Sequence, residues 1–430
     1  MMGALTLSAQ PYERVMNLQE LFSLADTASK TIKIYESIVS GADQDISVAK
    51  NAYLPDINFS ASATYNGNAW VSDRNFSNGQ SFISLHFGNS FAIEASQVVF
   101  TGGAIRNRVG TLEVEKSIAE WDLTSHRQEI YFLLTGYYLD LYKYRNLQKV
   151  YERNMAQTRQ VIQDMHAREA VGIVLTNDIT RYEGQYQNLE YKHTELNSSI
   201  NIYNNKLVTM LGLEPQTEIY PDTTLLNSKM PKPLEVEFQN RALAYSPQLN
   251  MNRLKLDMLE KQRKVARAGY IPKVSIIAGD NLKGPITYEI PVLNNNINTW
   301  YIGVGLTFSI GNLYKTPKEL SRIRTTKEQY NNELNSSEEN VTLNVRAAYV
   351  HYLDSFELLK TQEKSLQLAR ENYAVVANRY ANDLVLVTDL VDADNLKLSA
   401  EVQYVNAQIN VIYNYYKLLY TTGTLNANIN

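Results

Sequence analysis

Two similar stretches lie about half a chain length apart, at residues 170–183 and 381–394. An alignment without gaps places these residues at equivalent positions: Ala170 and Ala381, Val174 and Val385, Leu175 and Leu386, Asp178 and Asp389. Each stretch interrupts a long helical pattern that resumes directly afterwards. Similarity at a fixed offset, here 211 residues, indicates an internal duplication. We therefore expect one long helical hairpin to be built twice.

The chain has 430 residues, more than a single compact core usually holds. We assign the following segments: 1–16 as a signal-peptide remnant or disordered N-terminus, 17–213 as the first repeat, 214–236 as a proline-rich linker, 237–422 as the second repeat, and 423–430 as a C-terminal tail. The first residues lack a basic region, but small side chains precede a possible signal cleavage point. The net charge of −4 offers no basic surface for nucleic acid.

The two long helices are expected at about 104–170 and 317–380. Each has a seam of residues spaced alternately three and four apart, which is typical of coiled-coil packing. The first seam includes Leu134, Tyr137, Leu141, Tyr144, Gln148, Tyr151, Met155, Thr158, Ile162 and Met165. The second seam starts at Val345, 211 residues after Leu134, so both seams share the offset of the duplicated stretch.

Four segments have the period of two that is typical of strands, near 55–65, 91–100, 274–278 and 300–310. In the first, apolar Ile57 and Phe59 alternate with polar Asn58 and Ser60. A strand with one apolar and one polar face suits a barrel between lipid and water, and four strands per chain require several chains to pool them. The alternative is a soluble two-layer sheet in an elongated helical protein.

The sequence contains no recognisable arrangement of catalytic residues. It has no cysteine, no apolar run long enough for a membrane-spanning helix, and no pattern of histidines with metal-ligand spacing. We predict no enzymatic activity, no cofactor and no metal.

Several short motifs follow one another along the chain, and some of them have counterparts in both halves. They are Tyr53-Leu-Pro, Val99-Phe-Thr-Gly-Gly103, Val171-Gly172 with Asp178, Ser246-Pro247, Tyr270-Ile-Pro272, Thr388-Asp-Leu-Val-Asp-Ala393, and the ending from Leu418-Leu419 to Gly423-Thr-Leu425. With these motifs the chain resembles the TolC-like family of outer-membrane efflux proteins, the outer membrane factors, over about residues 17–425.

The resemblance implies a mainly helical α+β fold, in which three chains pool four strands each into a twelve-stranded transmembrane β-barrel above an α-helical periplasmic tunnel. It implies a passive channel in the Gram-negative outer membrane, for tripartite efflux or type I secretion of small molecules or proteins. The implied partners are two further chains, outer-membrane lipid, a periplasmic adaptor (membrane fusion) protein and an inner-membrane pump. A soluble coiled-coil structural or adaptor protein is the alternative.

The duplicated stretch carries the candidate gate. Asp389 and Asp392 lie three apart, on one helix face, and the resemblance implies rings of these carboxylates at a constriction. An acidic residue at a helix N-terminus also stabilises the helix, so a capping role is equally open.

The resemblance also implies a tip latch. Tyr380 and Asp178 match its tyrosine and aspartate, whereas Val385 occupies the position of its arginine. Arg181 or Arg379 could substitute, and we expect a looser or differently latched gate.

Overall fold

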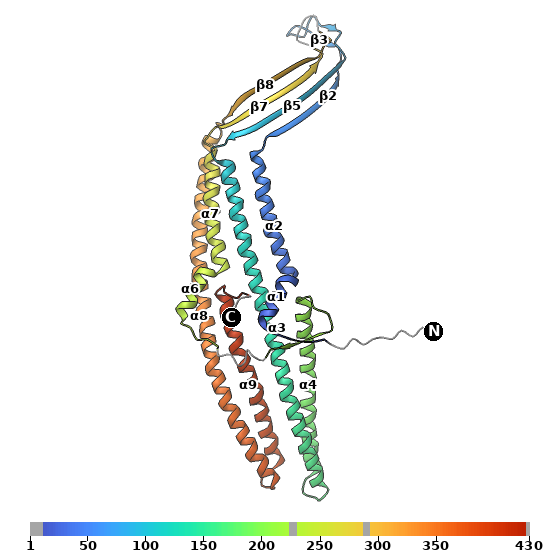
Figure 1. Cartoon of the computed structure of the whole chain (residues 1–430), viewed down its shortest axis with the longest axis vertical. Helices are drawn as coiled ribbons and strands as arrows, with labels where there is room; N and C mark the ends of the chain where they lie inside the picture. Colours follow the sequence, from blue (N-terminus) through green and yellow to red (C-terminus); the bar gives the residue numbers. More distant parts are fainter. Residues whose placement is uncertain (1–11, 223–229, 287–292, 427–430) are drawn as a thin grey trace, which may run out of the picture. The chain divides into compact units, whose positions relative to one another are not determined.

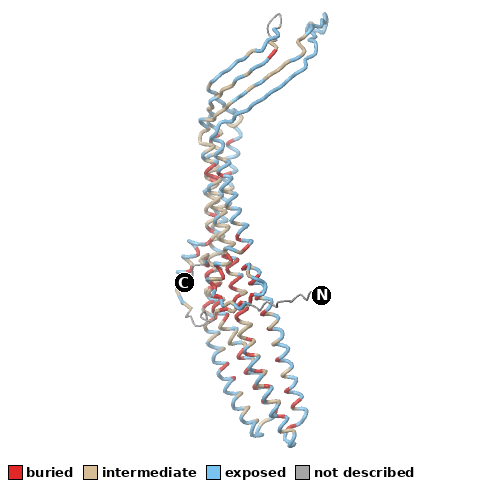
Figure 2. The backbone as a smooth tube through the Cα atoms, turned by 45° about the vertical axis from the view of Figure 1, so that its right-hand side comes forward, coloured by how far each residue is buried: buried red, intermediate tan, exposed pale blue. Residues whose placement is uncertain are grey.

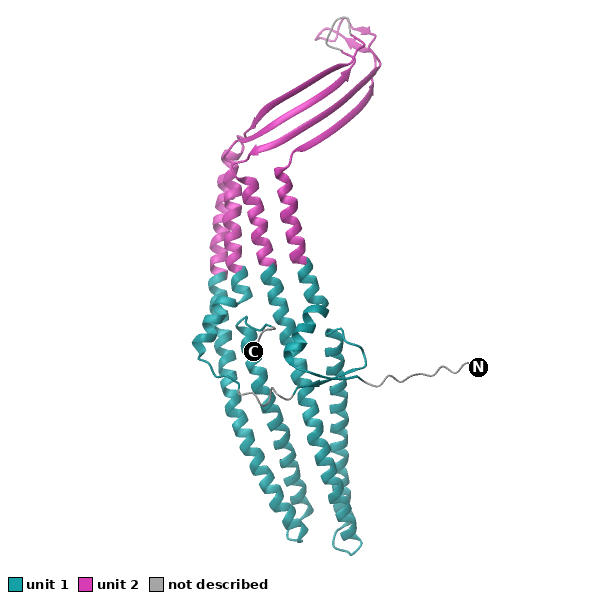
Figure 3. Cartoon of the chain, in the orientation of Figure 1, with its two compact units in different colours: residues 1–37, 120–251, 334–430 teal, residues 38–119, 252–333 magenta. Residues whose placement is uncertain are grey.

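The computed structural model describes residues 12–222, 230–286 and 293–426 (Figure 1). The chain divides into two compact units (Figure 3). Unit 1 comprises Met1–Ser37, Glu120–Met251 and Leu334–Asn430, and unit 2 comprises Ile38–Ala119 and Asn252–Glu333. The expected division into two repeats stays a prediction, because each compact unit contains residues from both.

Two long helical hairpins lie mainly in unit 1, and the longer helix of each begins in unit 2. The first is formed by α3 (Ala104–Glu169) and α4 (Thr176–Met210), and the second by α8 (Asn312–Ala381) and α9 (Val387–Thr421). Both turns lie in the duplicated stretches, as expected. The helical bounds also agree within a few residues, except that α8 begins before Pro317 and includes it. Pro317 is the sixth residue of α8 and lies beyond the first turn, so its missing N–H removes one intrahelical hydrogen bond.

The core of unit 1 is rich in tyrosine, and the seam residues of both long helices are buried or half-buried (Figure 2). The Tyr131 hydroxyl donates to the Asp26 carboxylate at 2.7 Å, and the Tyr138 hydroxyl donates to the Met16 carbonyl at 2.9 Å. A buried tyrosine hydroxyl without a partner carries a desolvation cost, which these two hydrogen bonds avoid. The thirty tyrosines of the chain are thus used partly as core residues.

The N-terminal region departs from expectation. Residues 12–16 are not a disordered remnant: they form β1 (Tyr12–Met16), which pairs in parallel with β6 (Thr217–Pro221) inside the expected linker. This pairing joins segments about 200 residues apart, so no local pattern reveals it. Residues 1–11 lie outside the described residues, and the expected signal peptide stays a prediction.

The sequence from Asn17 to about Leu54 predicts one helix, but the structure divides this segment into three pieces. They are α1 (Leu18–Ala28), α2 (Lys30–Lys50) and the short 3-10 helix η1 (Asn51–Tyr53). Asn17 caps α1, its side chain accepting the Glu20 N–H at 2.8 Å. Ser29 has extended backbone angles and separates α1 from α2. After the linker, α6 (Glu235–Tyr245) and α7 (Pro247–Ala268) follow, with Pro247 at the first position of α7.

One buried side chain, Asn204 of α4, holds β6 in place. Its amide donates to the Thr217 carbonyl at 2.9 Å and accepts the Ile219 N–H at 2.8 Å. We expect Asn204→Leu to lower the free energy of unfolding by about 2–4 kcal/mol, because two buried backbone groups lose their partners. Thermal denaturation followed by circular dichroism measures this, with the exposed neighbour Asn205→Leu as control. Equal melting temperatures for the two variants would contradict it.

Unit 2 contains a four-stranded antiparallel sheet with the strand order β2-β5-β7-β8. Its strands are β2 (Asp56–Tyr65), β5 (Phe87–Phe100), β7 (Lys273–Gly284) and β8 (Ile297–Thr307). The expected strands are present, although β7 is longer than predicted. The loop expected between the first two strands contains a small hairpin of β3 (Ala69–Val71) and β4 (Gln80–Phe82).

One face of this sheet is mostly apolar and exposed, although Asp280 also lies on it. The register aligns four residues in one row across the four strands: Phe59, Ile93, Asp280 and Trp300. The side chain of Trp300 is 76% exposed. The same face carries Ile57, Ile302, Val304 and Leu306, all exposed. Exposed apolar area of this extent marks a contact with a partner or a membrane. Among the described residues, no helix is apolar over a length that would cross a bilayer.

Candidate functional site at the hairpin turns

The two hairpin turns have the same backbone design. The Ile173 N–H donates to the Arg168 carbonyl at 3.0 Å, and the Leu384 N–H donates to the Arg379 carbonyl at 2.9 Å. In each turn the residue just before this donor is left-handed, Gly172 with φ +78° and Asp383 with φ +61°. These are Schellman helix ends, which favour glycine. An aspartate at this position is uncommon and needs support from its surroundings.

That support comes from Arg168 on α3, in the other hairpin. Its guanidinium forms an ion pair with the Asp383 carboxylate and donates to the carbonyl oxygens of Tyr380 at 3.3 Å and Ala381 at 3.4 Å. The guanidinium carbon also lies 5.3 Å from the centre of the Tyr380 ring. A cation at the C-terminal end of a helix is favourable because the last carbonyls are unpaired. Arg168 therefore ties the first hairpin to the end of α8 in the second.

The structure brings two of the four predicted gate residues into this neighbourhood. Burial raises the pKa of Tyr380, the positive charge of Arg168 lowers it, and the negative charge of Asp178 raises it again. Asp178 lies half-buried in the first turn of α4. Tyr380 and Asp178 are therefore close enough to interact electrostatically, and Arg168 is the arginine beside them.

The other two predicted residues lie apart from this contact. Asp389 is exposed in the first turn of α9, and its carboxylate accepts the Leu386 N–H at 3.1 Å. Asp392 is exposed one turn further along α9. Neither forms a hydrogen bond or ion pair with Tyr380 or Asp178 in the described chain. Asp389 thus has a capping contact, which does not exclude a second role facing other copies of the chain.

Sequence reasoning missed Arg168 and Asp383. Within the described ranges, neither Arg181 nor Arg379, the two substitutes considered, forms an ion pair. A signal was available in the duplication: the offset of 211 residues aligns Arg168 with Arg379, and Gly172 with Asp383. Asp383 occupies the position equivalent to the left-handed Gly172, so a stabilising contact with its side chain is expected. The sequence does not show which residue makes that contact.

Beneath this contact, apolar side chains join the two hairpins. The cluster contains Met165, Val174, Ile179, Tyr182, Val387 and Leu390. The turns themselves expose aliphatic side chains at equivalent positions: Ile173 and Leu384, Leu175 and Leu386. The two hairpins are therefore packed together by apolar side chains near their ends, and their turns expose further aliphatic side chains.

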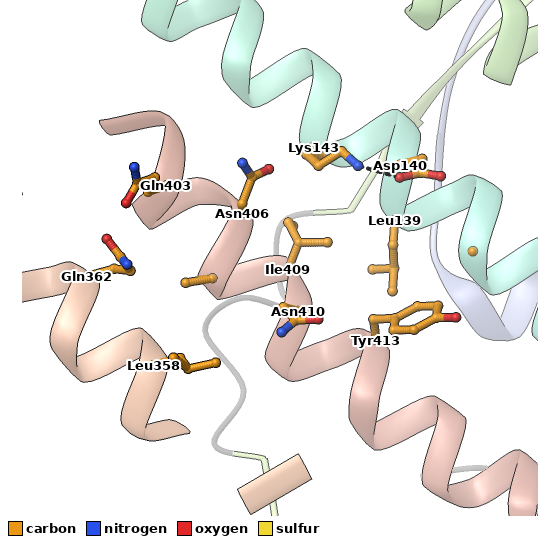
Figure 4. A pocket seen from close by; sticks show the side chains of 12 residues that line it. Leu139, Asp140, Lys143, Leu358, Gln362, Gln403, Asn406, Ile409, Asn410 and Tyr413 are labelled. Atoms are coloured by element: carbon orange, nitrogen blue, oxygen red, sulfur yellow. Dashed lines mark hydrogen bonds and ion pairs between the residues drawn. The ribbon is translucent and has the colours of Figure 1, made fainter. Parts of the chain in front are cut away.

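A cavity of about 590 Å³ lies further along unit 1, between α3, α8 and α9 (Figure 4). Its lining includes four amide side chains, Gln362, Gln403, Asn406 and Asn410, and the Lys143–Asp140 ion pair at 2.6 Å. Amides form hydrogen bonds but do not titrate near neutral pH. The cavity therefore presents mainly uncharged hydrogen-bonding groups together with one ion pair.

Comparison with known proteins agrees with this architecture. Residues 239–424 match the family described as outer membrane efflux protein. The chain is 21% identical to the outer membrane efflux protein BepC of Brucella suis over 395 residues, which cover 90% of this chain and 80% of BepC. The second half of the chain thus matches the outer membrane efflux protein family, and the whole chain is similar to one of its members.

Solved structures show the same fold across nearly the whole chain. VceC of Vibrio cholerae has a TM-score of 0.77 at 16% identity, covering 94% of this chain and 96% of VceC. The CmeC outer membrane channel of Campylobacter jejuni has a TM-score of 0.77 at 15% identity, covering 96% of this chain and 87% of CmeC. At these identities the likeness concerns the fold, which is that of channel proteins and not of enzymes.

The family assigns this efflux protein to the outer membrane of a Gram-negative bacterium, with its helical tunnel in the periplasm. The predicted mainly helical fold with long hairpins and few strands is confirmed. The soluble scaffold that was the alternative is not favoured.

Proposed function

We propose that this efflux protein acts as a passive trimeric duct, in which three chains pool their four-stranded sheets into one twelve-stranded barrel. The observation that carries this proposal is the sheet of unit 2. Its outer strands β2 and β8 each have one unpaired edge, and one face is mostly apolar and exposed. Closing the edges against neighbouring copies satisfies the backbone, and lipid covers the apolar face.

The hairpin turns would form the gate of this duct. Three-fold symmetry places Asp389 and Asp392 of each chain around one axis, giving six carboxylates that favour cations. Tyr380 and Asp178, with Arg168 and Asp383, would hold each protomer's two hairpins together and keep the gate closed. The exposed positions of Asp389 and Asp392 support this assignment, because neither carboxylate is committed to an ion pair within the described chain.

A passive duct needs an energy source, so an inner-membrane pump and a periplasmic adaptor are proposed partners. The amide-lined cavity of unit 1 and the exposed aliphatic side chains of the turns are surfaces on which an adaptor could be bound. The proposed cargoes are small molecules or proteins, exported by tripartite efflux or type I secretion and selected mainly by the proposed pump.

The mass of the detergent-extracted protein tests the assembly. We expect light scattering, corrected for bound detergent, to give about three times the chain mass of 49.0 kDa for protein taken from the outer-membrane fraction. The same material should produce conductance steps in planar lipid bilayers. A monomer or dimer that stays in solution without detergent would overturn the proposed duct and the gate with it.

A further inference from the structure

Three charged side chains of α9 are buried where the second hairpin faces the first. Asp394, Lys397 and Glu401 are only 5%, 6% and 8% exposed. Their spacings of three and four residues place them on one helix face. We call these three residues the α9 charge network. Charged side chains are seldom buried to this extent unless they are paired.

The α9 charge network makes its contacts across the boundary between the hairpins. The Lys397 ammonium lies 3.1 Å from the Asp394 carboxylate and donates to the Gln157 side-chain oxygen of α3 at 2.8 Å. The Glu401 carboxylate accepts the Asn154 amide of α3 at 3.0 Å. These contacts fix the position of α9 along α3.

Side chains of α8 and α4 complete the surroundings. Arg370 of α8 lies 3.1 Å from the Glu401 carboxylate, and the Lys397 ammonium lies 4.0 Å from the centre of the Tyr373 ring. Tyr182 of α4 is close enough for Asp394 to raise its pKa, after burial as the main cause. The hydroxyls of Tyr182 and Thr158 are buried and make no hydrogen bond within the described residues.

The α9 charge network sets the relative position of the two hairpins but contributes little net free energy to their association. Burial raises the pKa of Asp394, against the opposing effect of Lys397, so the ionised carboxylate is disfavoured at this site. A buried ion pair loses about as much in desolvation as it gains in attraction, and apolar residues of similar size are often more stabilising. When the hairpins separate, each charge regains water. Separation of the apolar cluster at the turns has no comparable gain, because exposure of apolar side chains to water is unfavourable.

We propose that the α9 charge network is a release joint, at which the two hairpins of a protomer part and rehydrate when the gate opens. This inference rests on the proposed gate at the hairpin turns. Apolar packing at this position would make separation unfavourable, whereas the charge network makes both the closed and the separated state accessible. Removal of one partner alone has the opposite effect, because it leaves a buried charge unpaired.

A single engineered thiol tests the release joint, since the chain has no cysteine. Thr158 is 1% exposed and lies one helical turn from Asn154 on α3, so Thr158→Cys should react with a maleimide only when the hairpins separate. We expect Arg168→Ala, which removes the contact at the turns, to speed labelling at least ~10-fold. Adding Asp394→Leu/Lys397→Met should slow labelling again by ~10-fold, whereas Lys397→Met alone should speed it further.

The chain offers a matched control in Lys192 and Glu195, an exposed acid–base pair three residues apart on α4, at 2.7 Å. Lys192→Met/Glu195→Leu in the Arg168→Ala background should leave the labelling rate unchanged. Circular dichroism and assembly mass verify that each variant is folded. If the leucine–methionine variant does not fold, Asp394→Asn/Lys397→Gln removes both charges at similar size, and slower labelling is again expected.

The release joint is overturned if labelling is insensitive to Arg168→Ala, or if the apolar variant labels as fast as its parent. Failure of the proposed duct is seen separately, as a missing trimer or missing conductance. The labelling rates measure hairpin separation whether or not the proposed trimeric duct is confirmed.

Discussion

Arg168→Ala is expected to open the channel. The change removes the ion pair to Asp383 and the donors to the Tyr380 and Ala381 carbonyls, so the end of α8 loses its cap from the first hairpin. The Arg168 side chain is 21% exposed and that of Asp383 is more exposed, so solvent weakens the ion pair. We therefore expect the contact to stabilise the closed state by about 1–2 kcal/mol per protomer. That free energy corresponds to a change of about 5–30-fold in the ratio of open to closed hairpins. Single-channel conductance in planar bilayers should show longer and larger openings.

Arg379→Ala is the matched control for this prediction. Arg379 is the same residue type at the equivalent position of the other hairpin, and it is exposed without an ion pair in the described chain. A double-mutant cycle of Arg168→Ala with Asp383→Asn separates the ion pair from other effects. Equal openings in the Arg168 and Arg379 variants, or no interaction energy in the cycle, would contradict the latch.

Removal of the charges at Asp389 and Asp392 is expected to abolish the cation preference of the channel. Asp389→Asn/Asp392→Asn removes six carboxylates from the proposed constriction of a trimer, but the asparagine oxygen at position 389 can still accept the Leu386 N–H. We expect the ratio of potassium to chloride permeability to fall several-fold, toward one, because the field that concentrates cations is lost. Reversal potentials across a salt gradient measure this ratio.

The alanine variants distinguish gating from capping. Asp389→Ala removes the charge and the cap together, so it should also destabilise α9 by about 0.5–2 kcal/mol, whereas Asp392→Ala should change permeability without that loss. Thermal denaturation and reversal potentials on the same proteins separate the two effects. If cation preference is unchanged in the double asparagine variant, the constriction does not lie at these aspartates.

The elements were predictable because their patterns are local. Heptad seams at Leu134 and Val345, period-two strands and the 211-residue offset all follow from neighbouring residues along the chain, and the structure places helices and strands accordingly. The turns were predictable for the same reason. The break at Ser29 was missed, because neither Ser29 nor its neighbours form a turn signal in the sequence.

The pairings between distant segments were decided only in the tertiary structure. Val385 occupies the position of the expected arginine, and the sequence alone predicts a looser or differently latched gate. The folded chain places Arg168, from the other hairpin, beside Tyr380 and Asp383.

The sequence by itself therefore determined the helices, the strands, their duplication and the resemblance to the family. Only the tertiary structure decided that β1 pairs with β6, that Arg168 meets Asp383, and that the α9 charge network is buried. The physical reason is that periodicity records which face of an element is buried, but not which distant side chain covers it. Charges such as Asp394 and Lys397 look like surface residues until another helix covers them.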